Sequence, residues 1–438
     1  YRLLENEFEE KGHLPYLFPI AVKEKDLKKE KEHAGFTPNV FWVTHAGEEK
    51  LEERFALRPT GEAQIYPMYS LWFRSYKELP FKAYQSRISA FRNEMTTRPF
   101  LRGREFLFFE SHNLFNDHKG AEEQITEDFG ICDKIIRQQL KIPFIYFERP
   151  QWDKFKGADN TYTPDTLMPD GKRNQLASTH DLGQNFSKAY DIKVQGDDKK
   201  AHYVWQTCFG PGIWRIMAAL IGIHGDDKGL IIPFDVAPLQ IIIIPIHSKN
   251  KEKNEEVTKF CKNIESQLKA KNYRLRIDNS EETPGFKFNN WELKGVPIRI
   301  EVGPRDIDIN SVTVVARTNK NKEQIKVSIL DDRIKTLSKE IDKAIKENAD
   351  NHFKNNTREE TTLNKLKITL ENHKGFVKVP FCTTEKKGEE CANILKEKTI
   401  GGNVCGVVFQ GKEKPLKGQK CIICGGPANH TVYVAKSY

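Results

Sequence analysis

Charged and aromatic side chains are concentrated in the stretch FRNEMTTRPFLRGREFLFFESH, residues 91–112. If it forms two strands joined by a loop containing Pro99 and Gly103, alternation places Arg92 and Glu94 on the same face of the first strand. A guanidinium suits a phosphate because it offers forked donors and keeps its charge. The pattern therefore predicts a phosphate-binding hairpin, and its alternative is a solvated hairpin with cross-strand ion pairs.

The return strand, REFLFFESH, places four side chains on one face. They are Phe106, Phe108, Glu110 and His112. A carboxylate beside these rings suits an ammonium group or an exocyclic amine, because both donate hydrogen bonds. The hairpin would then present a cationic and acidic floor beside an aromatic wall.

The composition limits the class of protein. The chain has 438 residues, and 70 basic against 61 acidic side chains give a net charge of +9. This excess is compatible with phosphate-bearing partners, although solvated lysine-rich faces produce it equally well. The longest apolar run, LQIIIIPI at 239–246, is too short to cross a bilayer and indicates a buried strand. Eight cysteines without a secretory signal argue against a disulfide framework, so we expect a cytoplasmic protein.

The chain divides into three regions that differ in their pattern of expected strands and helices, and these regions must position the side chains above. Residues 1–233 mix short strands and helices without regular alternation, which favours an antiparallel sheet surrounded by helices. Residues 234–340 alternate strand and helix, as in a compact α/β domain with a mixed or parallel sheet. Residues 341–438 combine a charged helical stretch with a small cysteine-bearing tail. The predicted fold class is α+β, with three domains in this order.

Longer segments around the hairpin resemble one family. FALRPTGEAQIYPMYSLWFRSYKELPFKAYQ, followed by the hairpin, is similar to the class II aminoacyl-tRNA synthetases and specifically to the prolyl-tRNA synthetases. NQLASTHDLGQNFSKAYDI resembles the proline-pocket segment of that family, and GPGIWRIMAALIGIHGDDKGLIIP resembles its third class motif. PGFKFNNWELKGVPIRIEVGPRDI is similar to its anticodon-binding domain. The resemblance implies an antiparallel-sheet catalytic domain, an α/β anticodon-binding domain and a small zinc-binding C-terminal domain.

The resemblance also implies a reaction and a nucleotide site. ATP, with Mg²⁺, would activate L-proline to prolyl-adenylate, and the prolyl group would pass to the 3′ end of tRNA-Pro. Arg92 and Arg215 would be catalytic, because they hold the α-phosphate and the γ-phosphate at either end of the triphosphate. Such chemistry needs positioning and charge neutralisation rather than a protein nucleophile. The implied ATP site is Arg92, Glu94, Arg102, Gly103, Gln175, Ser178 and Arg215.

A second implied set would bind L-proline. Thr60 and Glu62 would bind the imino group, and a carboxylate is apt there because a secondary ammonium has two protons to donate. Taken alone, His180 fits a satisfied structural histidine equally well. The implied proline site is Thr60, Glu62, Arg92, Phe108, Glu110, His112 and His180.

The segment that resembles the anticodon-binding domain offers stacking and base-edge partners for unstacked bases. The implied tRNA contacts are Lys287, Trp291, Arg299, Glu301, Arg305 and Asp306. Trp291 and Arg299 fit strand packing and a surface charge equally well. No membrane and no DNA partner is implied.

Two cysteine pairs in the tail are typical of a four-thiolate Zn²⁺ site, although the first pair is more widely spaced than usual. They are Cys382 with Cys391 and Cys421 with Cys424. Because the tail is short, we expect zinc binding to be coupled to its folding. The expected ATP site lies in a different domain, so loss of zinc should affect adenylate formation less. The alternative is four ordinary reduced cysteines. Cys132, Cys208 and Cys261 lie in apolar segments, where we expect inert thiols.

Further alternatives remain open at this stage. A catalytically silent RNA-binding paralogue would be expected to lose one of the key charged residues, all of which are present. A second alternative is a synthetase for threonine, histidine or glycine, although a threonine-specific enzyme would need a polar pocket or a metal in its catalytic domain. The run LPYLFPIAV resembles the end of the motif that forms the class II dimer interface, so a homodimer is implied by analogy. No Walker motif is present, which argues against a P-loop ATPase.

Overall fold

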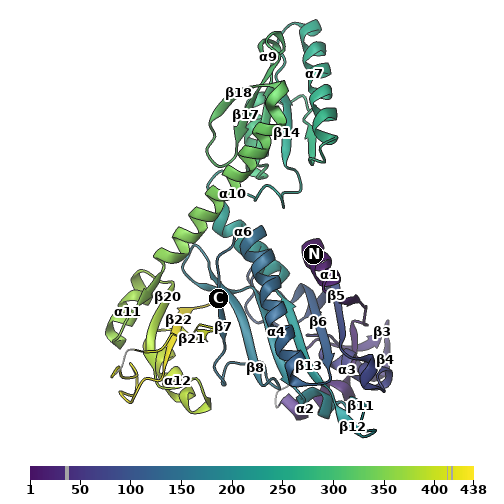
Figure 1. The fold of residues 1–438 in the computed structure, drawn as a ribbon, viewed down its shortest axis with the longest axis vertical. Helices are drawn as coiled ribbons and strands as arrows, with labels where there is room; N and C mark the ends of the chain where they lie inside the picture. The colour runs from purple at the N-terminus through teal and green to yellow at the C-terminus, as the bar shows by residue number, and fades with distance from the viewer. Residues whose placement is uncertain (35–38, 412, 416–417) are drawn as a thin grey trace. The chain divides into compact units, whose positions relative to one another are not determined.

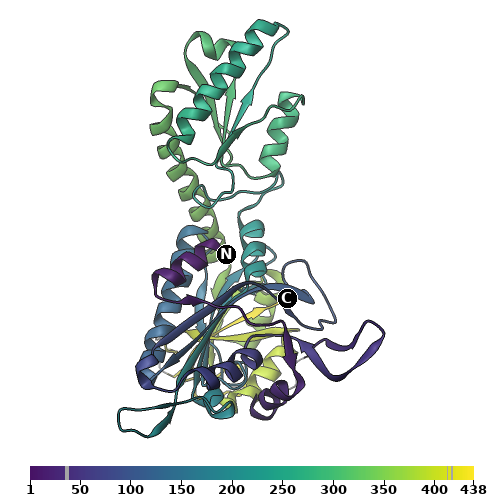
Figure 2. The same ribbon diagram turned by 90° about the vertical axis from the view of Figure 1, so that its right-hand side faces the viewer.

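A computed structural model describes residues 1–34, 39–411, 413–415 and 418–438. The chain forms two compact units, which are drawn in Figures 1 and 2. Unit 1 comprises Tyr1–Ile135, Phe144–Ala218 and Asn355–Tyr438, and unit 2 comprises Ile136–Pro143 and Ala219–Lys354. In the described part of the chain, no helix is both long and apolar enough to cross a membrane.

Unit 1 is built on a twelve-stranded sheet. In spatial order its strands are β1 (Leu14–Pro15), β5 (Phe81–Phe91), β6 (Glu105–Phe115), β13 (Trp205–Pro211), β10 (Ala177–Gly183), β8 (Asn160–Leu167), β7 (Ile145–Glu148), β21 (Gly402–Val408), β22 (His430–Lys436), β20 (Phe376–Phe381) and β19 (Thr357–Glu359). A short strand, β9 (Arg173–Gln175), pairs with β8. Only the β1–β5 and β19–β20 pairs are parallel, so the predicted antiparallel sheet is confirmed.

Helices and two smaller sheets complete unit 1. The helices are α1 (Arg2–Glu10), α2 (Glu24–Ala34), α3 (Glu62–Trp72), α4 (His118–Cys132), α5 (Asn185–Ala189), α11 (Leu363–Asn372) and α12 (Glu389–Lys398), and α6 (Ile213–His224) begins in it. The smaller sheets are β2 (Ala21–Lys23), β4 (Glu49–Leu57) and β3 (Trp42–Ala46), and β11 (Lys193–Gln195) with β12 (Ala201–Tyr203). Figure 1 shows α4 running along the strands, where it contacts β6, β10 and β13. The Asp117 side chain caps α4 by accepting a hydrogen bond from the Gly120 amide at 2.9 Å.

The β5–β6 hairpin forms as the alternation predicts, but its loop begins earlier than expected. The strands pair from Phe81 opposite Leu114 to Phe91 opposite Glu105. Arg92 and Glu94 therefore lie beyond the end of β5, and strand alternation does not place them on a common face. Their positions are set by the loop, in which the Arg92 amide bonds the Arg104 carbonyl at 2.8 Å.

The tail continues the large sheet of unit 1. Strand β21 pairs antiparallel with β7, and Figure 1 shows the tail strands β20, β21 and β22 beside it. The approach is close, because a Cβ added at Gly406 would lie 2.0 Å from the Glu148 carbonyl oxygen. Gly406 also has a φ of +131°, which favours glycine. The tail therefore packs as part of unit 1.

Unit 2 contains the mixed sheet expected of an α/β domain. Its strands are β15 (Leu275–Ile277), β14 (Ile241–Pro245), β16 (Ile298–Val302), β17 (Ser311–Ala316) and β18 (Lys322–Lys326), and its helices are α7 (Lys251–Lys269), α8 (Pro284–Leu293), α9 (Pro304–Asp308) and α10 (Leu330–Asn355). The first three strands are parallel and the last two antiparallel.

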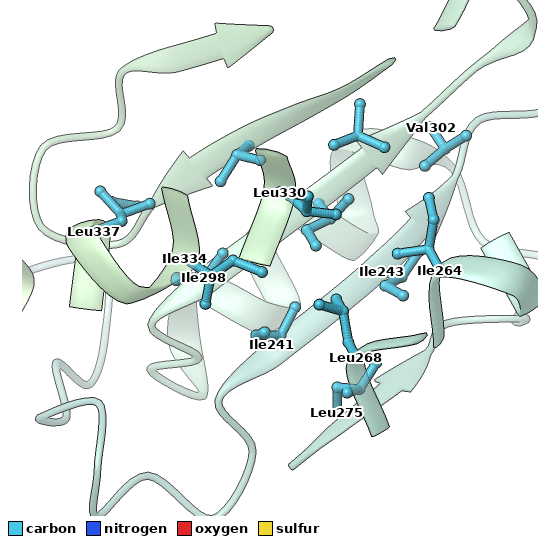
Figure 3. Close-up of a cluster of buried hydrophobic side chains, with 14 of the residues drawn as sticks. Ile241, Ile243, Ile264, Leu268, Leu275, Ile298, Val302, Leu330, Ile334 and Leu337 are labelled. Atoms are coloured by element: carbon cyan, nitrogen blue, oxygen red, sulfur yellow. The ribbon is translucent and has the colours of Figure 1, made fainter. Parts of the chain in front are cut away.

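The apolar run in β14 is explained by burial on both faces of the sheet. On one face, Ile241 and Ile243 pack against side chains of α7 and α10, as Figure 3 shows. On the other face, Ile242 and Ile244 pack beside Trp291 of α8. Each fully buried side chain of this kind contributes about 1.5–3 kcal/mol, so the run stabilises a central strand rather than a membrane segment.

Candidate active site

Unit 1 contains a cavity of ≈ 390 Å³ beside the β5–β6 hairpin. Its walls come from the hairpin loop, β6, β10, β13, the start of α3 and the start of α6. All but one of the residues assigned to the ATP and proline sites line it. Those that do are Thr60, Glu62, Arg92, Glu94, Arg102, Gly103, Phe108, Glu110, Gln175, Ser178, His180 and Arg215.

One end of the cavity is cationic. Arg102 pairs with Glu94 at 3.2 Å, and Nε of Arg215 donates to the Leu101 carbonyl at 3.3 Å. The exposed Arg92 guanidinium makes no hydrogen bond or ion pair with any residue that the structure describes. Burial lowers the pKa of Arg215, and the charges of Arg92 and Arg102 lower it further. This mutual repulsion favours an anion between the arginines.

The other end holds a buried carboxylate. Glu62 is the first residue of α3, where the helix dipole stabilises a negative charge, and is only 2% exposed. Its Oε1 receives a weak contact from the Cys208 thiol at 3.8 Å. Its Oε2 is buried and accepts no hydrogen bond from any described residue. Because such an atom costs about 1–3 kcal/mol, this end of the cavity is suited to a ligand with N–H donors.

A second carboxylate, that of Glu110, is paired with protein side chains. Gln85 donates to its Oε1, and its Oε2 lies 3.1 Å from Nε2 of His112. A Cβ added at Gly61 would lie 2.2 Å from Oε1. The chain therefore passes Glu110 closely at a position where only glycine fits.

His112 is the assigned residue that lies outside the cavity lining. It sits behind Glu110 on β6, and its Nδ1 lies 2.9 Å from the Tyr66 hydroxyl. Burial alone would lower the pKa of His112, but Glu110 and Glu62 outweigh it and raise the pKa. The structure thus gives His112 the position of a positive partner for Glu110 rather than a wall of the cavity.

His180 lies in the cavity wall and has the opposite character. Its Nδ1 lies 2.9 Å from Oγ1 of Thr161, and its ring packs on Phe155 with centroids 4.6 Å apart. Burial and the nearby His112 lower the pKa of His180 to about 3. It is therefore a neutral ring at physiological pH.

The sequence assigned no role to several residues that line the cavity, among them Phe100, Arg149, Phe155, Arg173 and Trp214. Cys208, which was expected to be an inert thiol in an apolar segment, also lines the cavity, and its sulfur lies 3.8 Å from the Glu62 carboxylate. Burial raises its pKa, so the expected inert thiol is consistent with the structure. Arg149 and Arg173 lie outside the segments that resemble the family, so no motif pointed to them. The other side chains are aromatic or apolar types that are also common in protein cores.

The residues assigned to tRNA contacts lie in unit 2, and three of them are buried. Lys287 is 4%, Glu301 4% and Trp291 6% exposed. Nζ of Lys287 donates to the Asp278 carbonyl at 3.2 Å, and Nε1 of Trp291 donates to the Asp278 carboxylate at 2.7 Å. These contacts correspond to the packing alternative for Trp291.

The other three assigned residues, Arg299, Arg305 and Asp306, are more accessible. Arg299 donates to Glu301 at 3.0 Å, and its guanidinium lies 4.2 Å from the Phe288 ring centroid. Arg305 is exposed, whereas Asp306 accepts a backbone hydrogen bond at the start of α9 at 2.8 Å. Arg305 is thus the more open of these cations.

The four tail cysteines come together. The sulfur atoms of Cys382, Cys391, Cys421 and Cys424 all lie within 4.8 Å of one another. The wide spacing of the first pair is explained by α12, which carries Cys391 back toward the end of β20. The cluster is compatible with a four-thiolate metal site.

Three family models match the chain. They are the "tRNA synthetase class II core domain (G, H, P, S and T)" at residues 41–224, the "Anticodon binding domain" at 240–337 and "Prolyl-tRNA synthetase, C-terminal" at 363–438. The proline–tRNA ligase of Thermofilum pendens is 49% identical over 440 residues, which cover 100% of this chain and 89% of the relative.

The chain belongs to the prolyl-tRNA synthetase family. The Pyrococcus abyssi proline–tRNA ligase is 40% identical over 442 residues, which cover 100% of this chain and 90% of that relative. Prolyl-tRNA synthetases are class II aminoacyl-tRNA ligases, so the enzyme class and the fold class predicted from the sequence are both confirmed.

Solved structures of prolyl-tRNA synthetases share the fold. The Giardia lamblia enzyme in complex with prolyl-adenylate matches with a TM-score of 0.94 and 34% identity, covering 100% of this chain and 90% of that one. The Cryptosporidium parvum enzyme complexed with halofuginone and AMPPNP matches with a TM-score of 0.92 and 33% identity, at the same coverage. The prolyl-tRNA synthetase architecture therefore extends over the whole chain.

We expect Gly61→Ala to destabilise the protein and displace Glu110, because the new methyl group would meet a carboxylate that Gln85 and His112 hold in place. Overpacking of this kind costs about 1–3 kcal/mol, which thermal unfolding would detect. Gly130→Ala is the matched control. It lies in α4 with nothing within 4 Å of the new Cβ, and should be neutral or stabilising. Equal stability of the Gly61 variant and the wild type would contradict this description of the site.

Proposed function

We propose that the cavity of unit 1 is where this prolyl-tRNA synthetase binds L-proline beside Mg²⁺–ATP and forms prolyl-adenylate. The prolyl group is then transferred to the 3′ end of tRNA-Pro, with release of AMP. The unpartnered, buried Oε2 of Glu62 carries this assignment, because it lies in a cavity whose other end is lined by arginines. An ammonium group at one end and a polyphosphate at the other match the two charges.

At the cationic end, Arg92 and Arg215 are the proposed catalytic residues. An oxygen of the proline carboxylate attacks the α-phosphorus, the bond to the bridging oxygen breaks, and pyrophosphate leaves with its electron pair. Arg92 holds the α-phosphate and the proline carboxylate, and Arg215 holds the γ-phosphate. Mg²⁺ would supply further charge neutralisation when bound, and Gln175 and Ser178 face the phosphates. Glu94, held by Arg102, and the backbone at Gly103 bind adenine.

At the acidic end, Glu62 and Thr60 bind the proline imino group. The secondary ammonium has two protons to donate, and Oε2 of Glu62 is an acceptor that the protein leaves free. Phe108 and the neutral ring of His180 enclose the proline ring. Glu110 and His112 form the charged pair behind them and keep the pocket in shape.

Unit 2 is the proposed anticodon-binding region. The proposed domains of the chain are the catalytic domain at 1–233, the anticodon-binding domain at 234–340 and the zinc-binding domain at 341–438. Arg305 and Arg299 offer side chains to unstacked bases, whereas the buried Lys287, Trp291 and Glu301 would act by shaping the surface, Glu301 by holding Arg299. Asp306 is proposed to orient the start of α9.

A homodimer is proposed from an exposed apolar patch on unit 1. The patch consists of Leu14, Leu17, Ile20, Leu71 and Trp72, and the Trp72 ring packs against neighbouring rings. It adjoins β1, the edge strand of the large sheet, in the region that resembles the class II dimer motif. Exposed apolar surface beside an open strand edge favours burial by a second copy. A cytoplasmic location is proposed, because none of the eight cysteines, all of which lie in described residues, forms a disulfide.

Zn²⁺ is the metal ion that we propose for the tail cluster, with Cys382, Cys391, Cys421 and Cys424 as its ligands. In a tetrahedral site with Zn–S bonds of about 2.3 Å, sulfur atoms lie roughly 3.8 Å apart, which a cluster within 4.8 Å accommodates. A bound ion would fasten the end of β20 to α12 and to the turn at Cys421.

Glu62→Gln should raise the KM for proline by roughly tenfold or more and leave the KM for ATP nearly unchanged, because it removes the charge that faces the ammonium group. ATP–pyrophosphate exchange, run with each of the twenty amino acids, measures both the substrate preference and this change. Glu123→Gln, on the exposed face of α4, is the control. Wild-type exchange that does not depend on proline would overturn the proposed function.

Arg92→Ala should lower kcat/KM for proline-dependent exchange by about 100-fold or more without unfolding the protein, because Arg92 is exposed and its guanidinium holds no described residue. Arg87→Ala is the matched control, since that exposed guanidinium pairs with Glu5 at 2.8 Å and does not line the cavity. Near-normal exchange by a folded Arg92 variant would show that the cationic end has been assigned wrongly.

Elemental analysis should find one zinc per chain, and Cys421→Ser should remove it. Zinc in four-thiolate sites contributes roughly 10–16 kcal/mol of apparent binding energy, so its loss should reduce hydrogen-exchange protection in β20 and β22. Cys261→Ser, in α7 of unit 2, should keep the metal. Freshly reduced protein without zinc would leave four ordinary cysteines as the explanation.

A further inference from the structure

Arg149 follows β7 and lines the cavity, although only 4% of it is exposed. One guanidinium nitrogen, Nη2, contacts both oxygens of the Asp165 carboxylate, at 3.0 Å from Oδ1 and 2.8 Å from Oδ2. Asp165 is fully buried and also accepts from Nη1 of Arg173 at 3.2 Å. Buried charges are tolerated only when they are paired and hydrogen-bonded, so this group has a fixed geometry.

The same guanidinium reaches Gln175 of β9. Nη2 of Arg149 lies 3.3 Å from Oε1 of Gln175. Because a guanidinium has donors only, it must face the amide oxygen, and the amide NH₂ of Gln175 is then directed away from Arg149. An NH₂ group donates hydrogen bonds and cannot coordinate a cation. In the cavity, the NH₂ group of Gln175 is therefore set to donate to a phosphate oxygen.

The third contact of Arg149 comes from the tail. Nη1 donates to the Cys405 carbonyl at 2.8 Å. Cys405 lies in β21 at a bulge, where the register with β22 shifts between Val404 and Gly406. Since only glycine fits at position 406, the bulge and the direction of the Cys405 carbonyl depend on that residue. The tail thus supplies one of the acceptors that hold Arg149 in place.

We propose that Arg149, clamped between Asp165 and the Cys405 carbonyl of the tail, is a positioning residue that directs the Gln175 amide NH₂ toward the phosphates of ATP. This inference rests on the proposed function of the cavity. Its consequence is that the tail forms part of the nucleotide site, so that changes in β21 alter ATP binding. This differs from the expectation that the tail matters little for adenylate formation.

The first test is Arg149→Lys, measured by ATP–pyrophosphate exchange. Lysine keeps the charge beside Asp165 but cannot serve three acceptors with a rigid fork. We expect the KM for ATP to rise by roughly tenfold and the KM for proline by less than about twofold, as for loss of one oriented hydrogen bond. An equal change in both KM values, or no change, would overturn the inference.

A double-mutant cycle separates positioning from general stability. If Arg149 acts through Gln175, the effect of Arg149→Lys on the KM for ATP should disappear in a Gln175→Ala background. A merely structural role predicts that the two effects multiply, which would contradict the inference. Wild-type protein without proline-dependent exchange would instead refute the proposed function, so the two failures are distinguishable.

Gly406→Ala tests the contribution of the tail and decides the matter if Arg149→Lys does not fold. Gly406 does not line the cavity, yet its substitution should displace the Cys405 carbonyl and raise the KM for ATP selectively. Gly130→Ala is the control, because its new Cβ meets nothing within 4 Å. A folded Gly406 variant with an unchanged KM for ATP would exclude the tail from the nucleotide site.

Discussion

Two buried carboxylates that line the cavity are the constraint on which the catalytic unit depends. Glu62 and Glu110 are both almost completely removed from solvent, and an unpaired charge in such a place is costly. The protein offsets this cost for Glu110 with His112 and with Gln85, which is itself held by the buried guanidinium of Arg58 at 3.3 Å. It leaves one oxygen of Glu62 without such a partner. In the proposed function, the ammonium group of the substrate completes the pairing.

The same principle accounts for the other end of the cavity. Arg92, Arg102 and Arg215 repel one another, and the pKa of Arg215 is lowered first by burial and then by its neighbours. A polyphosphate relieves that repulsion. In the proposed function, binding thus uses the charges of Glu62 and Arg92, which no described side chain pairs, whereas paired residues such as Glu110 and Asp165 hold their neighbours in place.

The sequence predicted much of this site because its signals are local. Alternation along β6 correctly placed Phe108 and Glu110 on the cavity face, but it did not show that His112, two residues further along, lies behind Glu110. Arg92 was assigned through its motif, although the strand ends one residue before it. Alternation could not determine where the loop begins, because the loop is fixed by contacts with Arg104 across it.

The part that could not be predicted depends on long-range pairing. Arg149 donates a hydrogen bond to the Cys405 carbonyl, 256 residues away, and no periodicity in either segment predicts that contact. It arises because β21 inserts next to β7 in the middle of the sheet rather than at its edge. Strand order therefore also sets an order of events during synthesis on the ribosome. Until residues 402–408 have been made, the edge of β7 is unpaired, and such an edge is open to pairing with other chains. The long sequence separation makes closure of this contact slow, so the Cys405 carbonyl reaches Arg149 late in folding.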